Sequence, residues 1–172
     1  MDDVPSEIRN AFEALRGSRR GLYIHGPVGC GKTHIAHALR KEWDDGATLR
    51  AQFWNTTELI RLMKADFDRK PKDKTRPETM ILGLDQLLFL DDLGAERMSD
   101  YVADVFQTIV NDRYERMIPI IITSNLPLSA LAERLGESGD RIASRLVEMC
   151  DIFELKGNDR RMEHVSKTVI MH

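Results

Sequence analysis

The sequence contains few cysteines, few aromatic residues, no large excess of either charge and no long hydrophobic run. Its two cysteines, Cys30 and Cys150, are too few for a disulfide framework or a cysteine-based zinc site. Every apolar run is shorter than the roughly 20 residues that a membrane-spanning helix needs. The acidic start of the chain also lacks the apolar stretch of a signal peptide. We therefore expect a reduced, cytoplasmic protein with no membrane partner.

Length and charge indicate one ordinary globular domain. The 172 residues include 25 Lys and Arg against 28 Asp and Glu, which gives a net charge of −3. This balance argues against a surface that is basic throughout, but it permits a local basic patch. Apolar residues make up 42% and charged residues 31%, so wholesale disorder is excluded. We expect an N-terminal helix or linker over 1–20, followed by one domain over 21–172.

Short apolar strands alternate with helical patterns along the chain. The strands are predicted at 22–25, 49–54, 87–90, 118–122 and 152–155. The helices are predicted at 31–43, at 99–116 with Ser99 as its cap, at 127–135, at 140–149, and from a cap within 55–57 to about 67. The first helix should stop at the run 44–46, and 69–79 should be a loop. Such alternation is typical of βαβ units, so we expect a parallel sheet with helices on both faces.

A phosphate-binding loop is predicted at 26–33. The run Gly-Pro-Val-Gly-Cys-Gly-Lys-Thr fits the pattern G-x-x-x-x-G-K-[ST], and it lies between a predicted strand and a predicted helix, as that motif requires. Its glycines let several backbone N–H groups converge on one phosphate. We expect Lys32 to reach the β- and γ-phosphates of ATP and the Thr33 hydroxyl to bind Mg²⁺. The predicted nucleotide contacts here are Gly26, Pro27, Val28, Gly29, Cys30, Gly31, Lys32, Thr33 and His34.

Two adjacent aspartates, Asp91 and Asp92, follow the apolar strand 87–90. Charges at the end of a buried strand need a neutralising partner, and Mg²⁺ on a bound nucleotide would be one. We assign Asp91, with Thr33, to the Mg²⁺ shell and Asp92 to orienting or deprotonating the attacking water. The next strand ends in polar residues that include Asn125, at the edge where open α/β sheets bind ligands. Asn125 could hold the water or the γ-phosphate.

Two basic features allow both a functional and a structural interpretation. Arg141 and Arg145 are four residues apart and share one helix face, which is either a solvated basic face or a functional one. The segment 61–76 contains seven basic and three acidic residues. This excess of positive charge suits a groove that follows single-stranded DNA, and the alternative is a solvated loop. The candidate DNA contacts are Arg61, Lys64, Arg69, Lys70, Lys72, Lys74 and Arg76.

Taken together, these residues resemble the AAA+ ATPases, and more narrowly the bacterial DnaC/DnaI-type helicase loaders and the IstB-type transposition ATPases. The similar runs are 21–34, 90–96, 111–114, 122–126, 141–146 and 157–161. The phosphate loop is generic, whereas the Asp-Asp-Leu-Gly-Ala-Glu and Thr-Ser-Asn-Leu runs are more specific. The resemblance implies a P-loop NTPase of the AAA+/ASCE type with a three-layer α/β/α core. Its parallel sheet would have five strands in the order 5-1-4-3-2, and its helical lid would be small or absent.

The resemblance also implies individual roles. The pair 91–92 matches Walker B, Asn125 matches sensor 1, and Arg145 matches an arginine finger that acts on the nucleotide of a neighbouring subunit. Arg161, ahead of Arg160, matches the sensor 2 arginine. A finger supplied in trans implies a homo-oligomer with ATP at the subunit boundary.

Several functions stay open at this point. The leading one is an ATP- and Mg²⁺-dependent ATPase that loads a replicative helicase in DNA replication, with weak turnover that oligomerisation or DNA stimulates. The second is an IstB-like ATPase that assists a DNA transposase. A P-loop kinase for a small metabolite and a nucleotide-gated module without hydrolysis are the alternatives from other classes. Loaders carry a partner-binding region ahead of the ATPase core, so we expect a shortened or a minimal member of the family.

Overall fold

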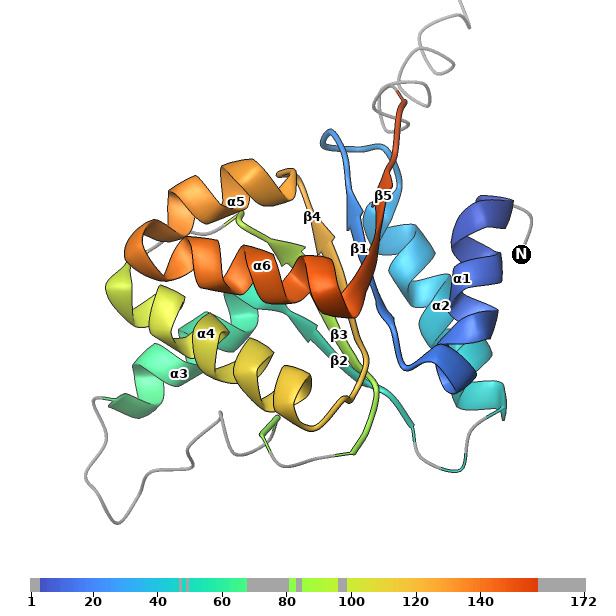
Figure 1. Cartoon of the computed structure of the whole chain (residues 1–172), viewed down its shortest axis with the longest axis horizontal. Helices are drawn as coiled ribbons and strands as arrows, with labels where there is room; N and C mark the ends of the chain where they lie inside the picture. Colours follow the sequence, from blue (N-terminus) through green and yellow to red (C-terminus); the bar gives the residue numbers. More distant parts are fainter. Residues whose placement is uncertain are drawn as a thin grey trace, which may run out of the picture.

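The fold is built on one parallel β-sheet (Figure 1). The computed structural model describes residues 4–46, 48, 50–67, 81–82, 85–95 and 99–157. The strands are β1 (Gly21–His25), β2 (Gln52–Asn55), β3 (Leu88–Leu93), β4 (Ile120–Ser124) and β5 (Cys150–Glu154). They lie in the order β2-β3-β4-β1-β5, and every neighbouring pair is parallel. This is the predicted order read from the other edge of the sheet, so the predicted fold class is confirmed.

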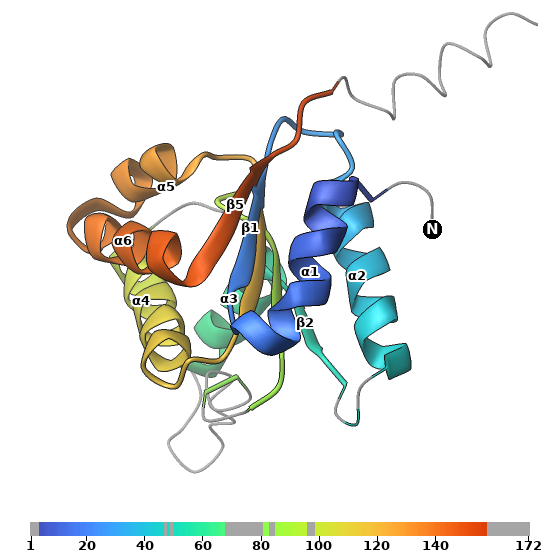
Figure 2. The ribbon, with the colours of Figure 1, turned by 45° about the vertical axis from the view of Figure 1, so that its right-hand side comes forward.

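Helices cover both faces of the sheet, which gives three layers (Figure 2). They are α1 (Ser6–Ser18), α2 (Lys32–Gly46), α3 (Thr56–Phe67), α4 (Asp100–Glu115), α5 (Leu128–Leu135) and α6 (Gly139–Met149), with the 3-10 turn η3 (Gly136–Ser138) between the last two. The apolar sides of α1 and α2 pack on one face, and those of α3, α4, α5 and α6 belong to the core on the other. No helix in the described ranges is both long enough and apolar enough to cross a membrane.

The helix ends follow local signals in two places. The Ser99 hydroxyl accepts a hydrogen bond from the Val102 N–H at the start of α4, as predicted. Gly136 ends α5 with a φ of 65°, a conformation that glycine adopts without a steric penalty. Both features confirm helix ends that the sequence predicts.

Other predicted boundaries were wrong, because tertiary contacts set them. The run 44–46 does not stop α2. Instead, the Asp44 carboxylate accepts the Ala51 N–H at 2.8 Å and forms an ion pair with Arg40, which extends the helix to Gly46. Similarly, β4 begins at Ile120 rather than at 118, because the Ile118 N–H bonds back to the Arg113 carbonyl and closes the turn after α4.

The bounds of the two outer strands, β2 and β5, and of β3 also differ from the predicted ones. Strand β2 lies at 52–55 instead of 49–54, and β5 lies at 150–154 instead of 152–155. Strand β3 does not end at 90 but continues through both aspartates to Leu93, and its pairing with β4 shifts register between Leu90 and Leu93. This irregularity belongs to the functional site.

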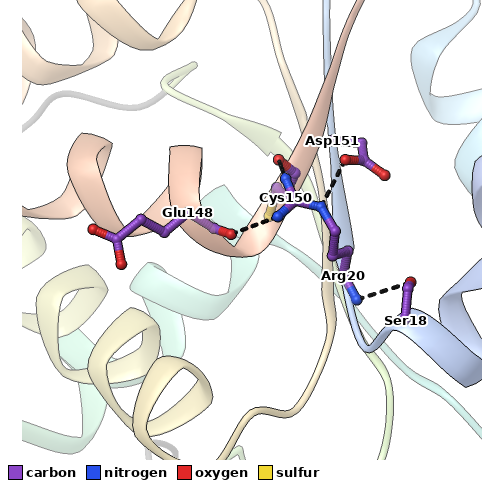
Figure 3. Close-up of polar contacts among 5 residues, drawn as sticks. All are labelled: Ser18, Arg20, Glu148, Cys150 and Asp151. Atoms are coloured by element: carbon purple, nitrogen blue, oxygen red, sulfur yellow. Dashed lines mark hydrogen bonds and ion pairs between the residues drawn. The ribbon is translucent and has the colours of Figure 1, made fainter.

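Arg20 ties the start of β1 to the junction of α6 and β5 (Figure 3). Its guanidinium donates to Asp151 Oδ1 at 2.7 Å, to the Glu148 carbonyl at 2.7 Å and to the Cys150 carbonyl at 2.8 Å. The Glu148 carbonyl lies in the last turn of α6, where carbonyl groups need partners from outside the helix and a cation suits the helix dipole. Burial raises the pKa of the Cys150 thiol to about 12, so this thiol stays protonated at neutral pH.

Candidate nucleotide site

The phosphate loop connects β1 to α2 at the carboxyl end of the sheet. Gly29 and Gly31 have φ angles of 79° and 100°, in the left-handed region that strains any side chain. A Cβ on Gly26 would come within 2.4 Å of the Leu155 carbonyl oxygen, so the loop also needs glycine where it passes the end of β5. The glycines of the motif thus serve backbone geometry, as the sequence predicts.

A hollow of about 290 Å³ lies between this loop and the ends of β3 and β4. Its lining residues are Val28, Gly29, Gly31, Lys32, Thr33, His34, Asp92 and Asn125. The structure therefore brings eight of the predicted nucleotide-site residues around one hollow. Three residues of the loop do not line this hollow. Cys30 is buried, and Gly26 and Pro27 contribute backbone carbonyls beneath the loop.

Lys32 is held inside the loop by its own backbone. Its Nζ donates to the carbonyl oxygens of Gly26 and Pro27, both at 2.8 Å, and the residue is only 6% exposed. A buried ammonium is costly unless it is hydrogen-bonded, and these two carbonyls provide the bonds. The geometry holds one positive charge at the base of the hollow, beside the first turn of α2.

Asp91 lies beneath the hollow and is bound by two hydroxyl groups. The Thr33 hydroxyl donates to Asp91 Oδ2 at 3.0 Å, and the Thr123 hydroxyl donates to Asp91 Oδ1 at 2.6 Å. The carboxylate is 4% exposed, so these bonds offset much of the cost of burying its charge. The oxygens of Thr33 and Asp91 are hard ligands placed side by side, which fits Mg²⁺ bound together with phosphates.

Asp92 points to the hollow because β3 is irregular at this residue. Its φ is 62°, in the left-handed region, where a non-glycine residue costs about 1–2 kcal/mol. The pairing of β3 with β4 shifts register between Leu90 and Leu93, so β3 has one more residue than β4 in this stretch. The left-handed φ of Asp92 lies within this irregularity. The Asn125 amide Nδ2 then donates to Asp92 Oδ1 at 3.0 Å. The two side chains that the sequence assigns to the water thus touch each other.

Thr123 is a site residue whose role the sequence analysis missed. Its hydroxyl donates to the Asp91 carboxylate and accepts the Asp92 N–H at 2.9 Å, so it contacts both acidic residues. It is buried, as the whole of β4 is. The available signal was a hydroxyl residue directly after a run of isoleucines in a buried strand, where an unpartnered polar group would be costly.

We expect a Thr123→Val variant to lose stability and ATP turnover, whereas Thr123→Ser should keep most of both. Valine preserves the shape but leaves one carboxylate oxygen and one N–H without their partner, which costs about 1–3 kcal/mol. Denaturant unfolding measures the stability, and phosphate release measures the turnover. A valine variant as stable and as active as the serine variant would show that the hydroxyl is not needed.

Arg145 lies outside the hollow, on the surface that α4 and α6 form. Its guanidinium lies over the Tyr114 ring, 5.5 Å from the ring centroid. The Tyr114 hydroxyl in turn donates to Glu148 Oε2 at 2.5 Å, and this hydrogen bond raises the pKa of Tyr114. Arg20 fixes the end of this same helix. Arg141 is exposed one turn earlier on α6.

The predicted DNA contacts lie only partly within the described structure. Arg61 and Lys64 are exposed on α3, and Arg61 pairs with Glu58 at 2.6 Å, which partly neutralises it. The other predicted DNA and sensor residues lie outside the described residues, namely Arg69, Lys70, Lys72, Lys74, Arg76, Arg160 and Arg161. The predicted small or missing lid would follow residue 157 and lies outside them as well.

Arg113 has a structural role that the sequence analysis did not assign. This residue of α4 is fully buried and donates to the carbonyl oxygens of Gln86 at 2.6 Å and Ile81 at 3.0 Å. Burial lowers the pKa of its guanidinium. Arg113 therefore holds the chain just before β3, the strand that carries both site aspartates.

Comparison with known proteins places this arrangement in a family. Residues 16–168 match the model of the family described as IstB-like ATP binding protein. The chain is 32% identical over 153 residues to an IS21 insertion-sequence putative ATP-binding protein of Pseudomonas aeruginosa, covering 87% of this chain and 56% of that protein. It is 28% identical to the replicative helicase loader DnaI of Bacillus subtilis, covering 84% and 49%. The chain thus spans about half the length of these relatives.

Solved structures agree with this result. The crystal structure of the DnaC helicase loader superposes with a TM-score of 0.71 and 28% identity, covering 87% of this chain and 88% of that one. The crystal structure of DnaI gives a TM-score of 0.73 and 27% identity, covering 92% and 88%. The fold is therefore that of the DnaC helicase loader and DnaI structures.

Proposed function

Because this chain belongs to the IstB-like ATP-binding family of AAA+ proteins, we propose that it hydrolyses ATP and acts in DNA replication as a helicase-loader-like assembly factor. One observation carries the proposal. Lys32, Thr33, Asp92 and Asn125 line one hollow, with Asp91 directly beneath it. This set provides phosphate binding, ligands for a metal and a candidate base in the places that phosphoryl transfer to water needs.

Nucleotide binding would depend on the loop and on Lys32. The N–H groups at the start of α2 and the Lys32 ammonium would supply the positive charge that binds the triphosphate. Thr33 and Asp91 are the residues that would hold Mg²⁺, which when bound neutralises charge on the phosphates.

Hydrolysis would depend on Asp92 and Asn125. Water attacks the γ-phosphorus, a P–O bond forms, and the P–O bond to the departing ADP breaks. Asp92 orients the water and takes its proton, while the Asn125 amide keeps Asp92 Oδ1 in position. The proton then passes to the released phosphate. Because ATP turnover with water as the only acceptor is expected, a turnover assay without any added metabolite separates this proposal from a kinase.

The test of the site is a Lys32→Ala variant. Removal of the ammonium should weaken ATP binding about 10- to 100-fold, since a hydrogen bond to a charged group contributes roughly 1.5–3 kcal/mol. Lys41→Ala, at an exposed position of the same helix, should bind like the unchanged protein. Titration with a fluorescent ATP analogue measures the affinity, and thermal unfolding checks the fold. If Lys32→Ala binds ATP as tightly as Lys41→Ala does, the assignment of the loop is wrong.

The partner is the second half of the proposal. The candidate partner is a replicative helicase, by analogy with the DnaI and DnaC loaders. A transposase is the alternative, which the family description and the 32% identity to an IS21 protein favour. Capture of a replicative helicase, compared with capture of an insertion-sequence transposase, on the immobilised chain distinguishes the two. Single-stranded DNA would bind along 61–76, and homo-oligomers would form through Arg145.

A further inference from the structure

A second hollow, of about 360 Å³, lies at the opposite end of the sheet from the phosphate loop. Most of its lining residues come from the end of α1 and from the segments just before β3 and β4. In Figure 1 these chain segments lie at the lower end of the sheet. The apolar floor of the hollow consists of Leu15, Leu87, Ile118 and Pro119. Arginine side chains surround this floor, and the mechanism proposed above uses none of these residues.

Two residues of this hollow have a strained backbone. In the described chain, three non-glycine residues have a left-handed φ: Asp92 at the nucleotide hollow, and Arg19 and Met117, at 56° and 50°. The last two both line the second hollow. Each follows a helix, α1 or α4, at the position where glycine is usual because a Cβ is unfavourable there. Both positions therefore carry a side chain, Arg19 and Met117, although the local backbone conformation favours glycine.

The rim of the hollow is positively charged. Arg16, Arg19 and Arg116 line it, with Asp85 as the one acidic lining residue. Arg116 is neutralised by ion pairs with Asp85 and, at 3.5 Å, with Asp112. The positive charge of the rim therefore rests on Arg16 and Arg19. The guanidinium of Arg19 makes no ion pair with any residue of the described ranges, and its side chain is exposed. Met117 adds an apolar group that is 64% exposed.

We propose that this hollow docks an acidic segment of a partner protein. An apolar side chain of the segment would lie on the floor beside Met117, and its carboxylates would pair with Arg16 and Arg19. Nucleic acid fits less well, because the stacking of unpaired bases uses an open aromatic face. The Arg16 guanidinium already lies 4.7 Å from the centroid of the Trp43 ring, and the floor is aliphatic. The ATP hollow at the other end of the sheet stays accessible.

The test uses the indole N–H signals of the two tryptophans, Trp43 and Trp54, of which only Trp43 lines the hollow. The probe is a synthetic peptide of glutamates with a few interspersed leucines. It should shift the Trp43 signal and leave the Trp54 signal in place. The matched peptide with lysine for each glutamate should shift neither, because the rim would repel it.

Glycine variants separate binding from folding. Arg19→Gly and Met117→Gly should each bind the peptide about tenfold more weakly, as loss of an anchoring side chain does. Their melting temperatures should be unchanged or raised, because glycine relieves the left-handed backbone. If the two side chains served the fold instead, the variants would melt earlier and bind normally. Lys41→Ala, at an exposed position of α2 that does not line the hollow, should change neither property.

Three results would overturn the proposal. They are an unshifted Trp43 signal with the acidic peptide, unchanged affinity in both glycine variants, and a larger Trp43 shift with an oligo-dT strand than with the peptide. ATP binding and turnover should be normal in both variants, because neither residue lies at the nucleotide hollow. If the peptide does not bind, the ATPase proposal is therefore unaffected. If ATP is not hydrolysed, the docking proposal is unaffected in the same way.

Discussion

An Asp92→Asn variant should bind ATP like the unchanged protein but hydrolyse it about 10²–10⁴ times more slowly. The amide cannot take the proton of the attacking water. Its oxygen can still accept the hydrogen bond that Asn125 now donates to Asp92 Oδ1 at 3.0 Å. Asparagine also tolerates the left-handed backbone that residue 92 adopts, with φ at 62°. The substitution therefore removes one chemical function and keeps the local structure.

Phosphate release under saturating ATP and Mg²⁺ gives the rate, and a fluorescent ATP analogue gives the affinity. Asp104→Asn, an exposed acid on α4, is the charge-matched control and should turn over normally. Asp91→Asn should instead lose Mg²⁺-dependent ATP binding, because Asp91 holds the Thr33 hydroxyl. Unchanged turnover in Asp92→Asn would remove this residue from the reaction. Loss of Mg²⁺-dependent binding in Asp92→Asn would exchange the roles of the two aspartates.

The phosphate loop and the existence of the strands could be predicted because their causes are local. The glycines, Lys32 and Thr33 stand at fixed spacing between an apolar strand and a helix, so the loop can be recognised without tertiary information. The buried strands are apolar runs flanked by polar residues, which made their existence clear. The resemblance to AAA+ proteins then supplied the strand order, which periodicity alone could not.

The geometry of the two aspartates could not be predicted, because β4 decides it. Asp92 faces the hollow owing to a register shift in β3, and the Thr123 hydroxyl, 32 residues away from Asp91, holds that shift from the neighbouring strand. The end of α2 could not be predicted for the same reason. The Asp44 carboxylate accepts the Ala51 N–H, and this contact extends a helix that local propensity would end. The burial of Arg113, which donates to the Gln86 carbonyl oxygen, likewise depends on a tertiary contact that the sequence does not reveal.

The link between α6 and β1 also appears only in three dimensions, and it bears on Arg145. Arg20 holds the last turn of α6 against the start of β1, and the other end of β1 leads into the phosphate loop. Helix α6 is thereby fixed relative to its own nucleotide hollow, with Arg145 outside that hollow over Tyr114. On the proposal that the chain forms homo-oligomers through Arg145, a guanidinium held in this way would act on the nucleotide of a neighbouring subunit rather than on its own ATP.

We therefore expect Arg145→Ala to bind ATP normally and to lose most turnover, by about 10³–10⁵ where fingers have been dissected in other nucleotidases. A guanidinium suits this role because its charge is permanent and its fork matches phosphate oxygens. Turnover per subunit of the unchanged protein should rise with protein concentration, since the finger comes from a second copy. Arg145→Ala should abolish that rise. Arg141→Ala, one turn earlier on the same helix, is the matched comparison and should keep it.

Mixing two inactive variants gives the decisive measurement. Asp92→Asn subunits keep an intact Arg145, and Arg145→Ala subunits keep an intact Asp92. Where the two meet, one boundary in the mixed assembly combines a working Asp92 site with a working finger. Partial recovery of ATP turnover in the mixture is therefore expected, although each variant alone stays inactive. If co-assembly is shown by light scattering or crosslinking and no turnover returns, Arg145 serves its own subunit or only packs against Tyr114.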